Sequence, residues 1–246
     1  MRETLFRFLL AFVRVFWRRP AIHGIEYLDL TRPAVLVANH LGSFGPIVLN
    51  AHLPLRLYPW VTHEVTDRRL CAEHLRTAFV EPELRLKPPL SGLVSKVIAG
   101  ICVAVMEYIG AIPVYRQNRK IIETVDASVR ALASGKHLLI FPEMHNAIGD
   151  RTVNNLDTGF LNIARALYRE RGLVLRFYPV CVKKDTNAIR IGRPIAYDPA
   201  LPFAREKRRI VGYLEQTLRM LHGYHAASAP PSRRQDRPIM PGRVSR

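Results

Sequence analysis

Cysteine is scarce in this sequence, and its scarcity argues against two classes of protein. The only thiols are Cys71, Cys102 and Cys181, and no two of them have the short spacing of metal ligands. An odd number of widely spaced cysteines argues against a disulfide framework and favours the reducing interior of a cell. All three lie in apolar stretches, so we expect small buried side chains and no metal site.

Acidic residues are also few. The chain has 20 Asp and Glu against 37 Lys and Arg, a formal charge of +17. Such a surplus implies an anionic partner: nucleic acid, an acidic membrane or a phosphorylated substrate. The sequence has no helix-turn-helix, zinc-finger or RNP signature, which argues against nucleic acid. Arginines gathered near both chain ends favour an anionic membrane surface.

An uninterrupted hydrophobic run is missing from the N-terminus, where Arg7 and Arg14 break the apolar stretch. With Glu3 and Arg18 they form one polar stripe on a helix, and the stretch is shorter than the roughly 20 residues of a spanning helix. It also lacks a signal-peptide cleavage site. We expect residues 1–20 to form an amphipathic helix lying in the membrane surface. The same pattern fits a helix that packs on its own domain.

Residues 21–225 alternate short apolar runs with helical periodicity. We predict strands at 34–38, 55–62, 137–142, 173–182 and 188–195, the last at a sheet edge, and helices at 46–51, 91–109, 118–134, 158–171 and 204–222. This order predicts one α/β domain with a largely parallel central sheet covered by helices. The apolar richness of 91–109 also fits a face or tunnel that meets lipid. The basic, proline-rich residues 226–246 are predicted to be a disordered tail.

Polar residues follow two of the predicted strands. Asn39 and His40 come directly after 34–38, and Glu143 follows 137–142. In parallel α/β folds the chemistry gathers at the carboxyl ends of strands. We therefore expect a site there.

Four separated blocks occur in the order of a known family: Asn39-His40-Leu-Gly-Ser-Phe-Gly45-Pro46, Gly110-Ala-Ile-Pro-Val-Tyr-Arg116, Phe141-Pro142-Glu143 and Tyr178-Pro179-Val180. Each is weak alone, but their ordered occurrence over about residues 22 to 200 is much more specific. The sequence resembles the glycerophospholipid acyltransferase superfamily, which includes lysophospholipid and glycerol-phosphate acyltransferases.

The resemblance implies transfer of a fatty acyl group from acyl-CoA or acyl carrier protein to a lysophospholipid or glycerol-phosphate hydroxyl, at the cytoplasmic face of the membrane and with no bound cofactor. It implies His40 as the catalytic base, since imidazole titrates near neutral pH. Glu143 is the second catalytic candidate. Arg116, whose planar guanidinium suits phosphate, joins Asn39 and His145 as a substrate-binding candidate.

Two of the blocks depart from the family pattern. Gly45 stands where the family has an Asp that orients the histidine, and Met144-His145-Asn146 replaces Gly-Thr-Arg. Three hypotheses follow. A carboxylate from elsewhere, Glu143 or Asp150, orients His40; or His145 belongs to a rewired site; or catalysis is lost and the chain is a lipid-binding or scaffold protein.

Each site residue also has a purely structural interpretation. His40 can bond a loop, Arg116 can be a solvated charge at a strand end, and Glu143 can cap backbone N–H groups. His63 and Glu64 align loosely with a polar pair between the first two blocks, and we interpret them as structural.

Overall fold

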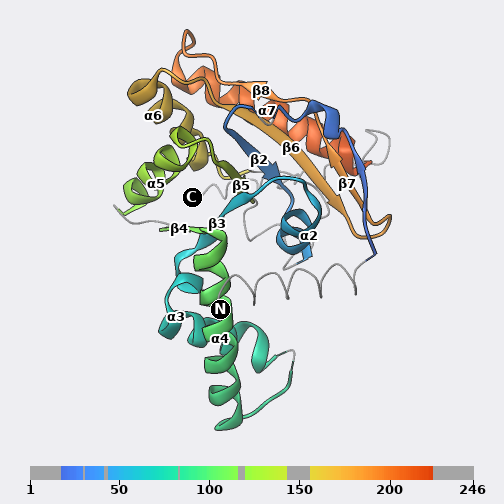
Figure 1. Cartoon of the computed structure of the whole chain (residues 1–246), viewed down its shortest axis with the longest axis vertical. Coiled ribbons are helices and arrows are strands. Elements are labelled where there is room, and N and C mark those ends of the chain that lie inside the picture. Colours follow the sequence, from blue (N-terminus) through green and yellow to red (C-terminus); the bar gives the residue numbers. More distant parts are fainter. Residues whose placement is uncertain are drawn as a thin grey trace, which may run out of the picture.

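The computed structural model describes residues 18–29, 31–41, 44–82, 84–115, 120–142 and 156–223 (Figure 1). Their strands form one mixed sheet in the order β1-β7-β6-β2-β5-β3-β4, with β8 also paired to β6. The strands are β1 (Ala21–His23), β2 (Ala34–Ala38), β3 (Leu57–Thr62), β4 (Ile112–Val114), β5 (His137–Ile140), β6 (Arg176–Lys183), β7 (Ala188–Ile191) and β8 (Ile195–Ala196). From β6 to β4 all neighbours are parallel, so the predicted largely parallel α/β sheet is confirmed.

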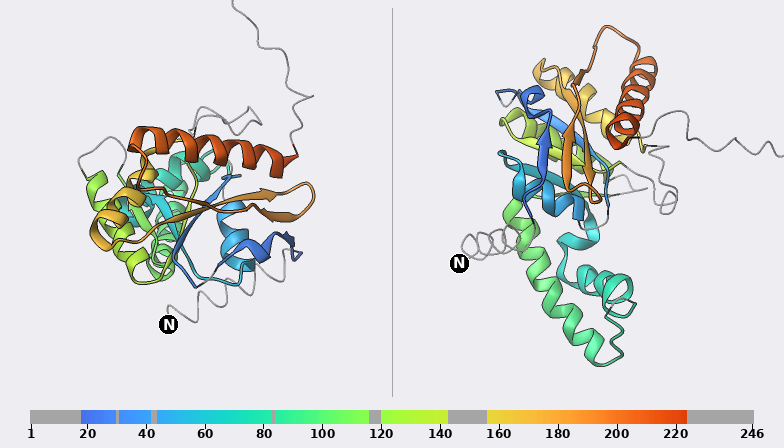
Figure 2. Two further views of the ribbon diagram at one scale, coloured as in Figure 1. Left: turned by 90° about the horizontal axis from the view of Figure 1, so that it is seen from above. Right: turned by 90° about the vertical axis from the view of Figure 1, so that its right-hand side faces the viewer.

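Helices cover both faces of this sheet (Figure 2). They are α2 (Phe44–His52), α3 (Arg68–Leu75), α4 (Leu90–Ile109), α5 (Ile121–Ala133), α6 (Asn162–Arg171) and α7 (Phe203–His222). Alternate residues of β2 point to opposite faces: Val35 and Val37 join the core under α5, α6 and α7, while Leu36 joins the core under α2. The central strands are thus buried on both faces, as continuous apolar runs predict.

The helices α3 and α4 form a hairpin that leaves the sheet after β3 (Figure 1). Asp67 caps the start of α3 by accepting hydrogen bonds from the backbone N–H groups of Arg69 and Leu70. The hairpin has a small core of its own, which contains Cys71 and Val103. It therefore projects from the sheet domain as a separate lobe.

The prediction of an edge strand at 188–195 was wrong. β7 ends at Ile191, and the short strand β1 pairs with its outer side, so β1 forms that edge of the sheet. Pro194 lies between β7 and β8, where a residue without an N–H group is tolerated. Three residues are too few to show a strand period, which is why β1 was missed.

Several predictions fall on residues outside the described ranges. The amphipathic helix at 1–20 lies almost wholly there, since the description begins at Arg18, and so does the tail at 226–246. Arg116, Glu143 and His145 are outside as well. These remain predictions from the sequence.

Candidate active site

The first sequence block begins where β2 ends. β2 lies between β5 and β6, with Val37 opposite Ile140 on one side and Ala38 opposite Val180 on the other. Because these strands are parallel, their carboxyl ends meet at one edge of the sheet. The third block continues from β5 and the fourth lies within β6, so three of the four blocks are direct neighbours there.

Asn39 is buried and is held by the backbone of β6. Its Nδ2 donates to the carbonyl oxygen of Val182 at 3.0 Å, and its Oδ1 accepts from the Val182 N–H at 2.7 Å. The side-chain amide thereby extends the β2–β6 ladder by one step. These contacts favour a positioning role for Asn39 over the predicted substrate-binding role, since the donor and the acceptor both face the protein interior.

His40 follows as an exposed side chain at this edge. Its ring meets the ring of Phe141 edge-on, with centroids 5.0 Å apart and planes at 79°. Phe141 directly follows β5, so this contact joins the first and third blocks. An aromatic partner fixes the orientation of an imidazole without covering it, because an edge contact leaves most of the ring open. The candidate base is thus both positioned and accessible.

Position 45 has no room for a side chain. A Cβ atom on Gly45 would lie 2.4 Å from the carbonyl oxygen of His40 and 3.1 Å from that of Asn39. Both neighbours are backbone atoms, which cannot rotate aside as the end of a side chain can. The start of α2 therefore packs against the backbone of the candidate base because position 45 is glycine. An orienting carboxylate cannot come from this position without movement of the chain.

The second block forms the outermost parallel strand. Gly110 ends α4 in the left-handed conformation, with φ +71°, and a Cβ there would lie 2.7 Å from the ring of Tyr58. Two features therefore require glycine at position 110: its left-handed φ and the close approach of the Tyr58 ring. β4 then pairs with β3 in parallel and leads to Tyr115 at the edge that carries His40.

A second histidine lies at this edge, after β3. The Nδ1 of His63 is 3.2 Å from the Oε2 of Glu64, and its ring lies 5.2 Å from the ring of Tyr115. Glu64 Oε2 is a buried atom without a hydrogen bond, so the close approach is not an aligned hydrogen bond. Lys120 places its Nζ 5.5 Å from the Tyr115 ring. From the sequence, His63 and Glu64 are interpreted as structural. The fold places them at the carboxyl end of β3, on the side of the sheet that carries His40.

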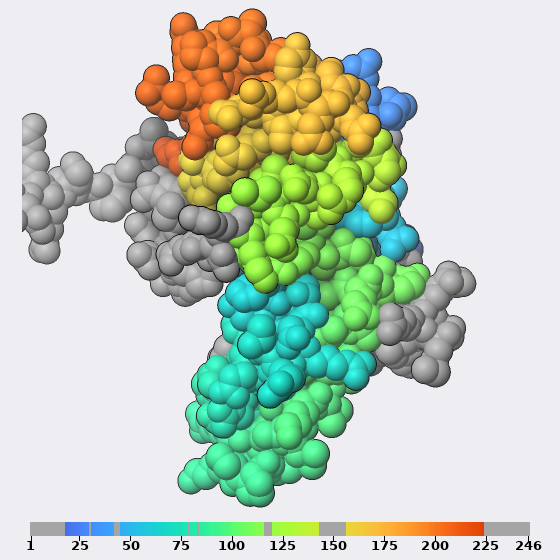
Figure 3. All heavy atoms as spheres, turned by 90° about the vertical axis from the view of Figure 1, so that its left-hand side faces the viewer, coloured from blue at the N-terminus to red at the C-terminus, as the bar shows by residue number. Residues whose placement is uncertain are grey.

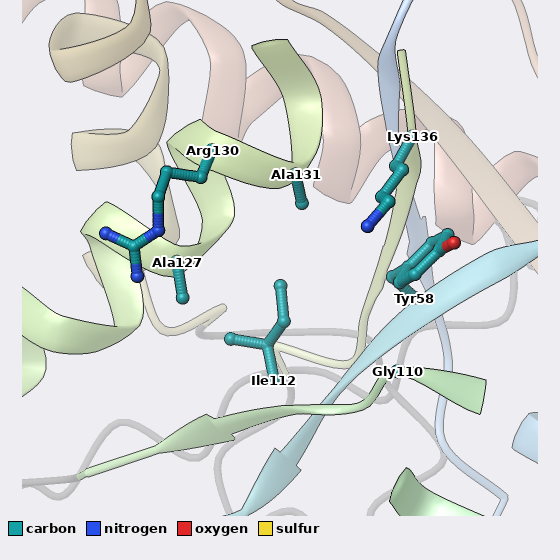
Figure 4. Close-up of a pocket in the computed structure, with 7 residues that line it drawn as sticks. All are labelled: Tyr58, Gly110, Ile112, Ala127, Arg130, Ala131 and Lys136. Atoms are coloured by element: carbon teal, nitrogen blue, oxygen red, sulfur yellow. The ribbon is translucent and has the colours of Figure 1, made fainter. Parts of the chain in front are cut away.

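The hollow in Figure 4 lies at the amino ends of the strands, opposite the carboxyl ends that carry His40. Its volume is about 280 Å³, and it is lined by Tyr58, Gly110, Ile112, Ala127, Arg130, Ala131 and Lys136. Tyr58, Gly110, Ile112 and Lys136 come from the amino ends of β3, β4 and β5, and the other three come from α5. The Lys136 Nζ lies 4.8 Å from the Tyr58 ring centroid. This hollow is therefore separate from the predicted site. In the described part of the chain, no three His, Cys, Asp or Glu side chains gather in a group that could hold a metal ion.

Comparison with known proteins gives a likeness of fold. No family model matches the sequence, and no curated protein sequence matches it. Among solved structures, the chain is similar to the 1-acyl-sn-glycerophosphate (LPA) acyltransferase PlsC from Thermotoga maritima. The match covers 92% of this chain and 85% of that chain at 14% identity, with a TM-score of 0.53. The chain thus has the α/β fold of that acyltransferase.

Proposed function

We propose that this protein transfers a fatty acyl group from acyl-CoA or acyl carrier protein to a lysophospholipid or glycerol-phosphate hydroxyl at the cytoplasmic surface of a membrane. The observation that carries the proposal is the placement of His40. It is an exposed imidazole at the carboxyl end of a central parallel strand, and it contacts the third sequence block through Phe141. The likeness of fold to an acyltransferase supports the same assignment.

In this reaction His40 acts as the general base. An alcohol has a pKa far above neutral, so it attacks a thioester efficiently only as its proton is removed. His40 takes that proton while the alcohol oxygen bonds to the acyl carbonyl carbon. The tetrahedral intermediate then collapses, the C–S bond breaks, and the imidazolium returns its proton to the leaving thiolate. The products are the ester and the free thiol of the carrier.

The remaining roles come from the sequence resemblance. Arg116 grips the phosphate of the acceptor, Glu143 holds acceptor hydroxyls or neighbouring donors, and His145 contributes to acceptor binding. Asn39 acts through the backbone, by keeping the residue before His40 in register with β6.

A second function is favoured by the packing at Gly45. In serine proteases, neutralising the carboxylate that orients the catalytic histidine lowers turnover by about 10⁴. Position 45 has no such carboxylate and no space for one. A catalytically impaired relative that binds lipid or acts as a scaffold is therefore the alternative.

The experiment is an acyl-transfer assay with matched histidine variants. The purified protein is incubated with labelled acyl-CoA or acyl carrier protein and a panel of lysolipids and glycerol phosphate. His40→Ala should abolish transfer. His23→Ala should leave it unchanged, since His23 is also exposed but lies on β1, separated from β2 by β6 and β7. Absence of His40-dependent transfer across the panel would contradict the proposal and favour the alternative.

A further inference from the structure

The helix α4 buries small side chains and exposes large aliphatic ones, the reverse of what is usual for a helix on the surface of a water-soluble protein. Its side towards α3 carries small residues: Ser91, Ser95 and Ala99 are buried at a spacing of four. The two hydroxyls are satisfied locally, Ser91 Oγ by Glu81 at 3.2 Å and Ser95 Oγ by the Gly92 carbonyl at 3.1 Å. Small residues let two helices approach closely, which is how helices pack in lipid.

The opposite side of α4 carries large aliphatic residues that contact little. Leu90, Leu93, Val97 and Ile101 are 51%, 64%, 60% and 47% exposed. Their spacing of three and four residues places them in one stripe along the helix. In a soluble helix this stripe would face the core. Here the buried side holds Ser91, Ser95 and Ala99 followed by Val103, and the stripe of larger aliphatic residues faces outward.

Two further large apolar residues of the lobe are exposed. Phe79 and Leu84, which precede α4, are 42% and 44% exposed. Figure 3 shows the hairpin as a projection beyond the sheet domain, so this end stands clear of the domain. Exposed apolar side chains gathered on one lobe in this way mark an interaction site, because their contact with water is unfavourable.

The charges around these apolar residues indicate which kind of partner binds there. From Phe79 to Met106 the chain carries Arg85, Lys87 and Lys96 against Glu81 and Glu83, and the only charged residue of α4 before Glu107 is Lys96. All three cations are exposed. Cations around an apolar stripe complement the anionic headgroups and acyl chains of a bilayer surface. Another protein would need a matching acidic rim, whereas an anionic membrane supplies both features at once.

We propose that the aliphatic face of α4, together with the end of the hairpin, is a docking surface for an anionic lipid bilayer. α4 is the helix in the described ranges that is long and apolar enough to cross a membrane. Because the polar helix α3 packs along it, α4 lies in the interface and does not span. The hairpin leaves the sheet at the carboxyl end of β3, on the side of His40, and α4 returns to the sheet at Gly110, before β4.

This inference extends the membrane-surface part of the proposed function, and it is tested by binding, which does not require catalysis. A Val97→Cys variant in a Cys102→Ala background carries an environment-sensitive fluorophore, while Cys71 and Cys181 are buried. We expect a blue shift on adding phosphatidylcholine vesicles that contain phosphatidylglycerol, and a smaller one with phosphatidylcholine alone. The same label at Met220→Cys on α7, which is 59% exposed, should not respond.

Affinity is then measured with two triple variants of matched exposure. Replacing Leu93, Val97 and Ile101 by Gln should weaken binding about a hundred-fold, since each partly buried aliphatic contributes about a factor of five. The control replaces Leu173, Val174 and Met220, which are 41%, 47% and 59% exposed, and should bind as the wild type does.

Three results would overturn the inference: equal loss in both triple variants, no shift of the label at position 97, or a shift there that depends on protein concentration without vesicles. The last would assign the face to a second copy of the chain. If docking holds but His40-dependent transfer is absent, the proposed function fails while the inference stands.

Discussion

Introducing a carboxylate next to His40 by Gly45→Asp should damage this protein and not improve it. The Cβ of any residue at position 45 would lie 2.4 Å from the His40 carbonyl oxygen, far inside van der Waals contact. Forcing extra atoms into a packed site typically costs about 1–3 kcal/mol, and we expect the upper part of that range because the opposing atoms are backbone. Better helix propensity than glycine returns up to about 1 kcal/mol. The net loss is then about 2 kcal/mol.

The measurement is thermal and urea-induced unfolding of Gly45→Ala and Gly45→Asp, with acyl transfer assayed in parallel. For a chain of this size, about 2 kcal/mol corresponds to a fall of roughly 4–8 °C in Tm. The alanine variant isolates the effect of the Cβ atom from that of the carboxylate. Gly212→Ala is the matched control: Gly212 lies within α7 with open space around its Cβ position, so it should stabilise by about 0.5–1 kcal/mol.

Wild-type stability in both position 45 variants would refute this reasoning, because the start of α2 would then relax without cost. Faster acyl transfer by Gly45→Asp than by the wild type would refute it more directly. That result would mean that the chain moves enough to let a carboxylate reach His40.

The remaining predictions concern buried polar groups and one thiol. Asn39→Ala should lower the free energy of unfolding by about 2–4 kcal/mol, measured in urea, because the N–H and the carbonyl of Val182 both lose a buried partner; a loss below about 0.5 kcal/mol would contradict it. Glu206→Ala should cost about 3 kcal/mol in the same assay, since this buried carboxylate accepts hydrogen bonds from Arg209 at 2.6 Å and 2.7 Å, and Glu206→Gln should cost less. Burial raises the pKa of Cys71 from 9.0 to about 12, so at pH 8 a disulfide reagent should label it about a thousand-fold more slowly in the folded than in the unfolded chain. The raised pKa also implies that the stability from the neutral thiol is complete below about pH 9 and is lost as the pH rises towards 12, a loss that Cys71→Ala should remove.

Most of the secondary-structure elements were predicted from patterns within short stretches of contiguous residues. The apolar run 34–38 predicted β2, and the helical spacing before Gly135 and Gly172 predicted α5 and α6, whose following glycines adopt φ +76° and +65°. The α/β class then followed from the alternation of strands and helices. The end of the same run also predicted that Asn39 and His40 are the polar residues at the carboxyl end of β2.

Local patterns did not predict the strand neighbours or the use of each side chain. β1 was missed and β7 was wrongly placed at an edge, because pairing partners lie far apart in the chain. Asn39 was predicted to bind substrate, but its amide extends a ladder to Val182. A lipid-facing surface on the helix at 91–109 was one expectation from its composition, but only packing against α3 determined which side of α4 is exposed.

The sequence by itself therefore determined the central strands, the long helices, their order and the identity of the histidine at the end of the first buried strand, because periodicity and turn chemistry are encoded within short windows. Tertiary structure alone decided that this histidine lies against Phe141, that Gly45 is pressed on its backbone, and that the aliphatic face of α4 points outward. Those three facts depend on contacts between distant segments. Burial and steric exclusion act between whole elements, and no short stretch of sequence contains both sides of such a contact.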